Sequence, residues 1–550
     1  MLNLKSIKLY FFSVIKLIFL KFKIFFYKSS YYNKKLITAK PERTFYSPSS
    51  FLISSLVGKE SEIYKIPNIS PDLIWEEKIT NNLQYNNLHS FLWLTKIDRK
   101  NSRLPTQSII GSWINKYYNY EIKSWDMIIT AKRIIAWASN TDIALYKSDN
   151  IYKKKFFISI IKQSNFLLQN IHALPFNSSR IVCFSAIILT GLIFKETSLN
   201  LKSGIKELEK IITMYFDNSG FPKSRNPEEV FICIKYLILL REWFKEAHEP
   251  IPEFLNNIIL KCGQCYSFLT NSHKKFPLFN GATEVDHKEY DFFLKRLKYN
   301  FKNNDNELGG FLKIKKNKIE LFFDVGNPPS NKFSNDYQAG SLAFELLSKG
   351  KKIICNSGYA KYLNPKLSLL SCSTAAHSTL CLNDTSSSRF EKNKTIRKIY
   401  GNTLIQSHKI VEKKILKDEN FYNAFGIHNG FEKKYGYLHK RSIKILNKNS
   451  IIYGTDELNK TKNVLSTVYY FIRFHIYPGI KIVKTKGGNT VLISLTNGEG
   501  WLLKSVNSNL DIEKNIFFGR KKTINNECIC ISGSTNQSKV SINWKIEKVE

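Results

Sequence analysis

The chain has 550 residues, 43% of them hydrophobic and 14% aromatic, which is enough for two packed domains and excludes a mainly disordered protein. Its formal net charge is +38, and its basic residues are 70 lysines and 13 arginines. Such a charge attracts polyanions, namely nucleic acid, an anionic membrane or an acidic polysaccharide, unless it only reflects an A/T-biased composition that places lysine on solvated faces. No basic cluster with interleaved aromatic residues matches a nucleic-acid module, so we expect an acidic polysaccharide and no nucleic acid as partner.

The first segment, residues 1–40, is basic and apolar, and Lys16, Lys21 and Lys23 interrupt its apolar run. A membrane span of ~20 apolar residues would have to bury these lysines. A signal peptide fits poorly, because residues 9–15 barely reach the length of its apolar core and no A-x-A site follows. The pattern favours a cationic amphipathic helix on a membrane or on the domain surface, so we expect peripheral membrane contact through this segment.

The nine cysteines are scattered, and only Cys262 with Cys265 and Cys528 with Cys530 are close pairs. The first pair lies in a helical pattern, where positions i and i+3 are neighbours on one face, and a single CxxC is a weak zinc signal. An odd number without regular spacing predicts buried free thiols rather than a disulfide framework.

Residues 60–295 are predicted to form an all-helical domain. Apolar residues recur there at three- and four-residue spacing, and the last segments are apolar on nearly every face, as inner helices of a double layer are. Antiparallel helix pairs in two layers give an α/α toroid, whose open face offers a groove to a long ligand. The segments with helical spacing are residues 125–137, 156–168, 180–194, 204–215, 227–243 and 252–269.

Two loops of this half carry polar side chains. Residues 218–227 end in Ser-Arg-Asn-Pro, with Asn226 at an N-cap position and Pro227 at the first helical position. Either this loop is only a capped turn, or Arg225 faces the groove and pairs with a carboxylate or sulfate, which its planar fork suits. The second loop contains Asn280 followed by Gly281, a dipeptide typical of a turn.

Residues 305–550 change to the alternation of β-strands. Short apolar runs are separated by Asn, Lys and Gly turns, and no helix-length pattern interrupts them. This predicts an antiparallel β-sandwich after a polar linker near residues 290–310. The expected fold class is thus a multidomain α+β protein, an N-terminal α/α toroid followed by a C-terminal antiparallel β-sandwich. The strand-like runs include residues 319–323, 451–454, 464–474, 491–495, 501–503 and 540–544.

Residues 324–390 concentrate turn residues, short strands and one polar site. They contain Asp324-Val-Gly, Gln338-Ala-Gly, Ser-Leu-Ala-Phe-Glu-Leu, Asn356-Ser-Gly and Ala-Ala-His377-Ser-Thr-Leu. This set resembles the signature of the heparinase II/III-like polysaccharide lyase family. The same family is resembled by three motifs of the helical half, which occur in the family's order. They are the Arg-Ile-Ile-Ala-Trp stretch at residues 133–137, the Ser-Arg-Asn-Pro loop and the Phe-Asn-Gly-Ala turn. The resemblance covers roughly residues 75–390.

The resemblance implies a lyase that cleaves uronic-acid polysaccharides by β-elimination. A base removes the proton α to the sugar carboxylate, the carboxylate charge is neutralised, and a Tyr protonates the leaving oxygen. Carried over by position, the resemblance assigns catalysis to Asp336 and His377. The family's Tyr position falls on residues 228–230, so the catalytic candidate is the nearest tyrosine, Tyr236, which on an inner helix also fits a core residue. The resemblance assigns neutralisation and substrate binding to Asn177, Arg180, Arg225, Asn226, Asn280, Gln338 and Asn356.

Some family members hold a metal in the β-domain. The matching positions here are Gln338, Asn356 and His377, and amide oxygens bind zinc poorly, so we expect no tight zinc site and no cofactor. His377 is expected to be a buried, hydrogen-bonded histidine that ties Gln338 and Asn356 together, with a groove-facing role as the alternative.

The expected function is that of a heparinase II/III-like polysaccharide lyase acting on an acidic glycan. The alternative is a non-catalytic polyanion-binding or glycan-binding protein, or one of envelope-polysaccharide biosynthesis, that keeps the same scaffold. The resemblance favours the periplasm or cell envelope, with the cytoplasm as the alternative because the N-terminus is a poor signal peptide. The sequence leaves the substrate and the oligomeric state open.

Overall fold

The computed structural model describes residues 4–57, 73–76, 79, 82–316, 318–361, 363–446, 450–462, 467–506, 508–520 and 522–549. Residues 60–72 of the predicted helical domain and residues 464–466 of one predicted strand lie outside these ranges. The chain divides into two compact units, which are described separately. The helical unit comprises Val14–Phe216 and Phe231–Cys262, and the β unit comprises Met1–Ser13, Asp217–Val230 and Gly263–Glu550.

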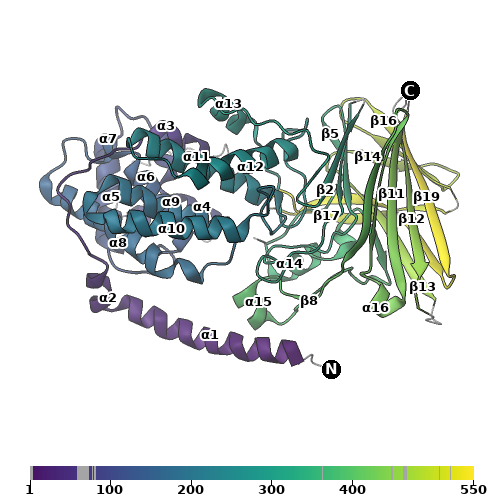
Figure 1. Ribbon diagram of the computed structural model, residues 1–550, viewed down its shortest axis with the longest axis horizontal. Helices are drawn as coiled ribbons and strands as arrows, with labels where there is room; N and C mark the ends of the chain where they lie inside the picture. Colours follow the sequence, from purple (N-terminus) through teal and green to yellow (C-terminus); the bar gives the residue numbers. More distant parts are fainter. Residues whose placement is uncertain are drawn as a thin grey trace. The chain divides into compact units, whose positions relative to one another are not determined.

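Helices α2 to α10 belong wholly to the helical unit, whereas α1, α11 and α12 cross its limits (Figure 1). Each segment with helical spacing in the sequence corresponds, within two residues at its ends, to part or all of one of the helices α6 or α8 to α12. Within the described ranges, no helix has both the length and the apolar content needed to cross a membrane. The bounds are α1 (Leu4–Lys28), α2 (Ser30–Lys35), α3 (Ser50–Ile53), α4 (Asn82–Ser90), α5 (Arg103–Tyr117), α6 (Met127–Ala138), α7 (Thr141–Ala144), α8 (Asn150–Asn170), α9 (Ser178–Ile193), α10 (Ser198–Tyr215), α11 (Pro227–Glu246) and α12 (Glu253–Leu269), with short 3-10 turns at Ser54–Leu56, Leu73–Trp75, Leu92–Lys96, Ile171–Ala173 and Lys195–Thr197.

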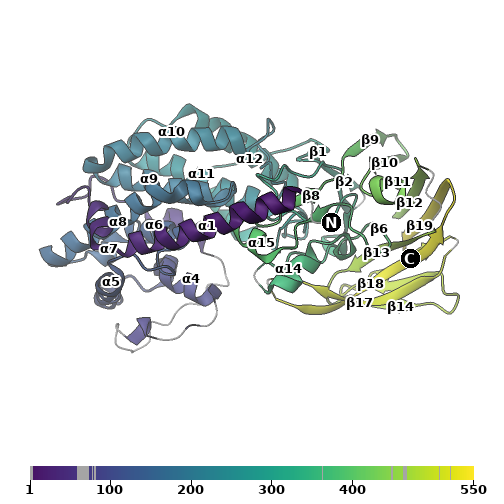
Figure 2. The ribbon, with the colours of Figure 1, turned by 90° about the horizontal axis from the view of Figure 1, so that it is seen from below.

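The inner helix of the helical unit is α9, which packs against α6, α8 and α10 (Figures 1 and 2). Every residue from Arg180 to Ile193 is buried, as the apolar residues on all its faces require. Asn177 begins this helix as its N-cap, because its side chain accepts a hydrogen bond from the backbone N–H of Ser179 at 3.1 Å.

A buried arginine fixes α6 within the same unit. The side chain of Arg133 is fully buried and stacks on Trp113, with its Cζ 3.9 Å from the ring centroid. A buried charge is tolerated where its donors find partners. Its guanidinium donates to Gln163 Oε1, His89 O, Ser124 O and Thr130 Oγ1 at 2.7 to 3.2 Å.

The β unit contains two large antiparallel sheets and one small sheet (Figure 1). In the described residues the larger sheet has nine strands in the order β1-β2-β3-β4-β5-β13-β18-β17, with β6 paired to β13, and the other has eight in the order β14-β15-β16-β19-β12-β11-β10-β9. The strands are β1 (Glu307–Leu308), β2 (Phe311–Lys316), β3 (Ile319–Asp324), β4 (Phe344–Ser348), β5 (Lys351–Cys355), β6 (Leu380–Leu382), β7 (Arg389–Phe390), β8 (Leu404–Gln406), β9 (Ile410–Lys417), β10 (Phe421–His428), β11 (Tyr437–Leu446), β12 (Ile451–Lys460), β13 (Val468–Ile476), β14 (Lys481–Lys484), β15 (Thr490–Ser494), β16 (Gly500–Ser505), β17 (Leu510–Phe517), β18 (Ile524–Thr535) and β19 (Lys539–Lys548); short helices are α13 (Lys288–Arg296), α14 (Pro365–Ser371), α15 (Lys394–Tyr400), α16 (Glu432–Tyr435) and a 3-10 turn at Thr374–Ala376.

The core of the β unit lies between the two large sheets. Strand β11 alternates buried and half-buried residues along its whole length, as a strand with one face on the core does. Strands β3 and β4 are buried at every position, because both of their faces are covered. Phe344 on the larger sheet stacks on Trp544 of the other, with the ring centroids 5.6 Å apart. The sheets are therefore packed face to face as a sandwich.

The cysteines form no disulfide bonds among the described residues. All nine are buried free thiols, which confirms the prediction. Burial raises the pKa of Cys372 to about 12 and that of Cys381 to about 11, so both thiols stay protonated.

Candidate active site

The loop before α11 is organised by Arg225, whose backbone adopts a φ of +58°. A guanidinium carries five N–H donors, and here all five have acceptors within the β unit. A Cβ atom at Gly326 would lie 2.3 Å from Arg225 Cζ, so only glycine allows this approach. Nε donates to Gly309 O at 2.9 Å, Nη1 to Gly326 O and Asn327 O at 3.2 and 3.3 Å, and Nη2 to Gly310 O at 3.2 Å and to the Asp324 carboxylate.

Arg225 is therefore a structural residue. Every N–H group is used in the structure, and substrate binding by Arg225, which would require that it gives up one of these bonds, stays a prediction. Burial raises the pKa of Asp324, and the positive charge of Arg225 opposes this shift. The pair ties the Ser-Arg-Asn-Pro loop to the end of β3.

The amide side chains next to Arg225 are also used by the scaffold. Asn226 caps α11, as predicted, because its Oδ1 accepts from the backbone N–H of Glu228 at 2.8 Å. Asn280 donates to Arg225 O at 3.1 Å. Gln338 accepts from the backbone N–H of Gly281 at 2.9 Å and donates to two further carbonyls. Substrate binding by Asn226, Asn280 and Gln338 stays a prediction.

Asp336 lies beside these residues and is partly accessible. Its carboxylate forms an ion pair with Lys361 Nζ at 2.7 Å, and the two side chains are 13% and 35% exposed. Its Cβ and carbonyl lie against Gly281, where an added Cβ would come within 2.7 Å. A catalytic role for Asp336 stays a prediction, and it requires that Lys361 leaves the carboxylate.

The motif Ala375 to Leu380 is explained by hydrogen bonds around Ser378. Its N–H donates to Asn356 Oδ1 at 3.0 Å, and its hydroxyl donates to Cys355 O at 2.6 Å and accepts from the backbone N–H of His475 at 2.9 Å. His377 is buried, as expected, but its Nδ1 donates to Ser373 O at 2.8 Å. The expected tie to Asn356 is therefore made by Ser378 rather than by the imidazole.

Arg441 connects this motif to a second buried network. Its Nη1 donates to Ser378 O at 2.7 Å, and its Nε and Nη2 donate to the two oxygens of Asp456 at 2.8 and 3.0 Å. Trp544 Nε1 also donates to Asp456, at 2.9 Å. The charged side chains of Asp456 and Arg441 are completely buried, so each depends on the other for compensation.

Two histidines extend the network with fixed tautomers. The N–H of Gly430 donates to His428 Nδ1 at 3.0 Å, so the ring proton of neutral His428 is on Nε2 and points to His439 Nδ1 at 3.1 Å. His439 Nε2 then donates to Asp456 at 2.7 Å. The chain of donors ends on the carboxylate, and the sequence analysis did not foresee it.

Three further histidines of the β unit are buried in the neutral form. Burial lowers the pKa of His377 to about 4. Burial, reinforced by the charge of Arg225, lowers the pKa of His408 to about 3, and burial with the neighbouring His377 lowers that of His475 to about 3. In the unfolded chain a histidine titrates near 6.5, so each of these residues binds fewer protons when folded.

We expect the stability conferred by neutral His377 to be lost as the pH falls from 6.5 to about 4. Between these values the unfolded state binds one more proton at this residue, and unfolding becomes easier by roughly 1.4 kcal/mol per pH unit. Urea unfolding of wild type and His377→Asn should show that the difference in unfolding free energy shrinks by about 2 kcal/mol between pH 7.5 and pH 5. The exposed His172 provides the control, because His172→Asn should leave the difference constant. An unchanged difference for His377→Asn would contradict the assignment.

The predicted residues of the helical unit lie in or beside its core. Tyr236 is buried, and burial, followed by the neighbouring Cys183, raises its pKa, which favours the core alternative. Arg180 stacks on Phe176 with its Cζ 3.8 Å from the ring centroid. Its Nε and Nη2 donate to carbonyls of the preceding loop at 2.6 to 3.2 Å. Neutralisation of a substrate by Arg180 or Asn177, and catalysis by Tyr236, stay predictions.

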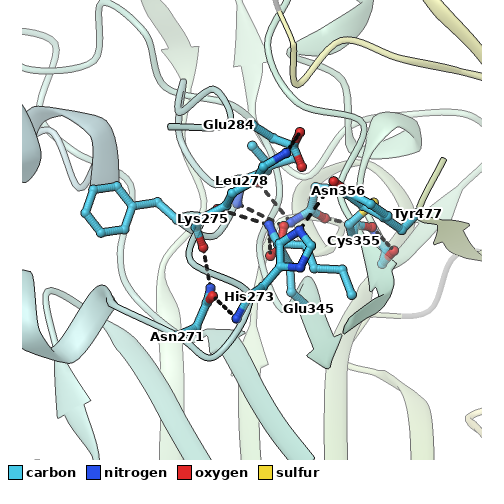
Figure 3. Close-up of polar contacts among 12 residues, drawn as sticks. Asn271, His273, Lys275, Leu278, Glu284, Glu345, Cys355, Asn356 and Tyr477 are labelled. Carbon is cyan, nitrogen blue, oxygen red and sulfur yellow. Dashed lines mark hydrogen bonds and ion pairs between the residues drawn. The ribbon is translucent and has the colours of Figure 1, made fainter. Parts of the chain in front are cut away.

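A different cluster of the β unit combines proton donors and acceptors with partial exposure. Its centre is Tyr477, directly after β13, whose hydroxyl lies 3.4 Å from His273 Nε2 (Figure 3). The same hydroxyl accepts from Arg520 Nη2 at 3.0 Å. His273 Nδ1 lies 2.9 Å from Gly350 O and donates to it, which leaves the Nε2 lone pair directed at Tyr477. Arg520 thus donates to Tyr477 and His273 donates to the backbone, while the Tyr477 hydroxyl has two acceptors, His273 Nε2 and the Glu284 carboxylate.

The protonation states in this cluster follow from burial and charge. Burial, reinforced by Lys352, lowers the pKa of His273 to about 4, so the imidazole is neutral at pH 7. Burial and the charge of Glu284 raise the pKa of Tyr477, so the phenol keeps its proton. Burial alone would raise the pKa of Glu284, but the charge of Lys352 and the bonds from Tyr477, Lys275 and Arg520 hold it at about 2.

A buried ion pair supports the loop that carries His273. Lys352 and Glu345 are completely buried and lie 3.0 Å apart. Glu345 accepts from the backbone N–H of Leu278 at 2.8 Å (Figure 3). Lys352 donates to Phe276 O at 3.0 Å. The loop is thereby fixed to β4 and β5. Arg520, in contrast, is 39% exposed and presents a positive charge outward.

His273, Tyr477 and Arg520 were not among the residues predicted from the sequence. The available signals were a polar residue in the loop after α12 and two polar residues that follow strands β13 and β17. Residues at strand ends and in loops often carry function, because a rigid scaffold positions them.

The residues at the family's metal positions do not fit a metal. The amides of Gln338 and Asn356 are bonded to the backbone, and His377 Nε2 is the one nitrogen of the three side chains that lacks a hydrogen-bond partner among the described residues. In that part of the chain, no group of three or more His, Cys, Asp or Glu side chains is placed to hold a metal ion.

Comparisons with known proteins agree with this architecture. Residues 302–545 match the family model described as heparinase II/III-like, C-terminal. A crystal structure of heparinase III is similar with a TM-score of 0.68 and 13% identity, over 93% of this chain and 87% of that one. A heparinase III gene product has a TM-score of 0.64 and 14% identity, over 90% and 85%. Heparan sulfate lyase HepC from Pedobacter heparinus has a TM-score of 0.61 and 14% identity, over 95% and 87%. No curated protein sequence matches the chain.

The architecture is that of an α/α toroid followed by an antiparallel β-sandwich, which is the fold of these polysaccharide lyases and confirms the predicted fold class. Residues 302–545 match the heparinase II/III-like family, which the motifs of the sequence resemble, and the structural neighbours share the fold of the whole chain.

Proposed function

We propose that the protein is a polysaccharide lyase that cleaves an acidic, uronic-acid-containing glycan by β-elimination. The observation that carries the proposal is the arrangement of His273, Tyr477 and Arg520, which supplies a neutral base, a protonated phenol and an exposed cation in one cluster. Support comes from the family and from the structural neighbours, whose names describe them as heparinase III and heparan sulfate lyase.

The cluster can perform both proton transfers of the reaction. His273 Nε2 accepts the proton from the carbon α to the sugar carboxylate, and the electrons of that C–H bond form the new carbon–carbon double bond. The bond to the glycosidic oxygen breaks with its electrons on oxygen, which takes the proton of Tyr477. Proton transfer from His273 to Tyr477 across their 3.4 Å contact then restores both groups.

Arg520 would neutralise the substrate carboxylate during this reaction. The carbanion develops beside an existing negative charge, so a cation is needed to stabilise it. The guanidinium is partly exposed and already oriented by its bonds to Glu284 and Tyr477. An anionic substrate beside His273 would also raise the low pKa of this residue toward neutrality and strengthen it as a base.

The test is an absorbance assay of the full chain on heparan sulfate, heparin, chondroitin sulfate, hyaluronan and alginate. Elimination creates a double bond conjugated with the carboxylate, so the ultraviolet absorbance should rise with at least one substrate. No rise on any of the five glycans would overturn the lyase proposal. Cell fractionation tests the accompanying proposal that the protein works in the periplasm or cell envelope.

The second candidate is a non-catalytic protein that binds polyanions or glycans, or serves envelope-polysaccharide biosynthesis, on the same scaffold. Two observations favour it: Arg225 uses its N–H groups for hydrogen bonds within the protein, and His377 and Tyr236 are buried. In the same assay it predicts no product, with binding of the glycan that weakens as salt is raised, because charged contacts are screened.

A further inference from the structure

The N-terminal helix α1 presents an exposed apolar stripe. Residues three or four positions apart lie on one side of a helix, and six such residues here form a continuous row. Their exposed fractions run from 45% to 79%. The stripe consists of Ile7, Phe11, Ile15, Ile18, Phe22 and Phe25.

The other side of α1 is attached to the protein. Ser13 and Tyr27 are buried, and the Tyr27 hydroxyl donates to Asn170 Oδ1 in the helical unit. The Tyr27 ring also contacts Tyr120 and Phe166, with centroids 5.1 and 5.8 Å away. The helix is therefore anchored at its C-terminal end through Tyr27, whereas the six residues of the stripe are exposed.

The charges on α1 have one sign. Its 25 residues include six lysines and no aspartate or glutamate. Residues seven positions apart lie on the same side of a helix. Lys21 and Lys28 therefore lie together along one edge of the stripe, and Lys16 and Lys23 lie together on the side opposite that edge. An apolar stripe between rows of lysine is typical of a helix that lies in a membrane interface, since long lysine side chains reach the headgroups.

We propose that α1 attaches the protein to a lipid surface with anionic headgroups, with its stripe in the acyl boundary and its lysines on the lipid phosphates. A second copy of the chain is the weaker occupant. Pairing two such stripes would gather twelve lysines without one acidic partner in the paired helices, whereas coiled-coil pairs rely on opposite charges beside the seam. A soluble polyanion would satisfy the lysines and leave the stripe in water.

The test is co-sedimentation of the full chain with phosphatidylcholine vesicles that contain or lack about one third phosphatidylglycerol, a composition whose surface potential attracts basic segments. We expect binding to the anionic vesicles that falls roughly tenfold or more when the salt is raised from about 0.1 to 0.5 M, because the Debye length shortens from about 10 Å to a few Å. Equal binding to both kinds of vesicle would overturn the electrostatic part of the proposal.

Two sets of variants locate the contact. The triple variant Phe11→Gln, Phe22→Gln and Phe25→Gln should lower the partition coefficient at least tenfold, and Lys21→Gln with Lys28→Gln should lower it several-fold. Matched controls are Leu104→Gln, Ile151→Gln and Leu199→Gln, which remove three other exposed apolar side chains, and Lys202→Gln with Lys206→Gln on α10. Circular dichroism confirms that each variant is folded.

Two results would overturn the proposal. The first is vesicle binding by the triple phenylalanine variant that equals binding by the wild type. The second is a dimer of the wild type without lipid, seen by sedimentation velocity, that the same variant converts to a monomer; this would assign the stripe to a second copy.

Discussion

Tyr477→Phe is expected to lower kcat for glycan elimination at least ~100-fold, because the variant removes the proton donated to the leaving oxygen while it keeps the ring. The phenylalanine ring retains the packing of Tyr477 against Phe517, whose centroid lies 5.8 Å away. The hydrogen bonds to Arg520 and His273 are lost. Initial rates of absorbance increase on the preferred glycan provide the measurement. KM should change much less than kcat, since the hydroxyl acts mainly in the transition state.

Tyr469→Phe is the matched control for this prediction. Tyr469 lies on the same strand, β13, and is 58% exposed, so its hydroxyl is remote from the proposed chemistry. A Tyr477→Phe rate within threefold of the wild type would show that another group protonates the leaving oxygen. Asp336 and Tyr236 would then be the next residues to substitute, because they are catalytic candidates that the family resemblance suggests.

Asp456→Asn is expected to lower the free energy of unfolding of the β unit by about 3–5 kcal/mol, since it leaves the Arg441 charge buried without compensation. The amide would also place N–H groups against donors of Arg441 or Trp544. Urea unfolding of the full chain, followed by near-ultraviolet circular dichroism of the buried tryptophans, measures the change. The His439 ring loses its acceptor as well, so the network fails at several points.

The exposed pair of Asp511 with Lys484 provides the comparison. These side chains lie 3.2 Å apart and are 59% and 36% exposed. Asp511→Asn should cost less than ~1 kcal/mol, because water screens an exposed pair and the freed charges are solvated. Equal costs for the two substitutions would mean that the buried network contributes no special stability.

The sequence pattern predicts helices and strands in which buried and exposed positions alternate with a regular period. Helix α9 was predicted from apolar residues at three- and four-residue spacing, and the sandwich from alternation such as that of β13. Such periodicities report burial directly, because each helix or strand turns its side chains by a fixed step. The family motifs then placed Asn226 at a helix N-cap and His377 in the interior, where the structure has them.

These patterns could not predict which residues that are far apart in the sequence come into contact. His273 and Tyr477 are 204 residues apart and meet because a loop and a strand end adjoin. Arg225 had the residue type of an anion ligand, but no pattern shows that five acceptors surround it. Local sequence gives the kind of side chain, whereas tertiary contacts decide whether its donors are free.

The bond between Arg225 and Asp324 also has a consequence for synthesis on the ribosome. The arginine leaves the ribosome 99 residues before its carboxylate, a delay of roughly 5–20 s at a typical rate of translation. During that time the segment Asp217–Val230, which belongs to the β unit, lacks the acceptors that Gly309, Gly310 and Asp324 later provide to Arg225. The nascent helical part therefore carries an unfinished end of α11 until the first strands emerge. We expect a chain truncated before residue 300 to need chaperone protection that the complete chain does not.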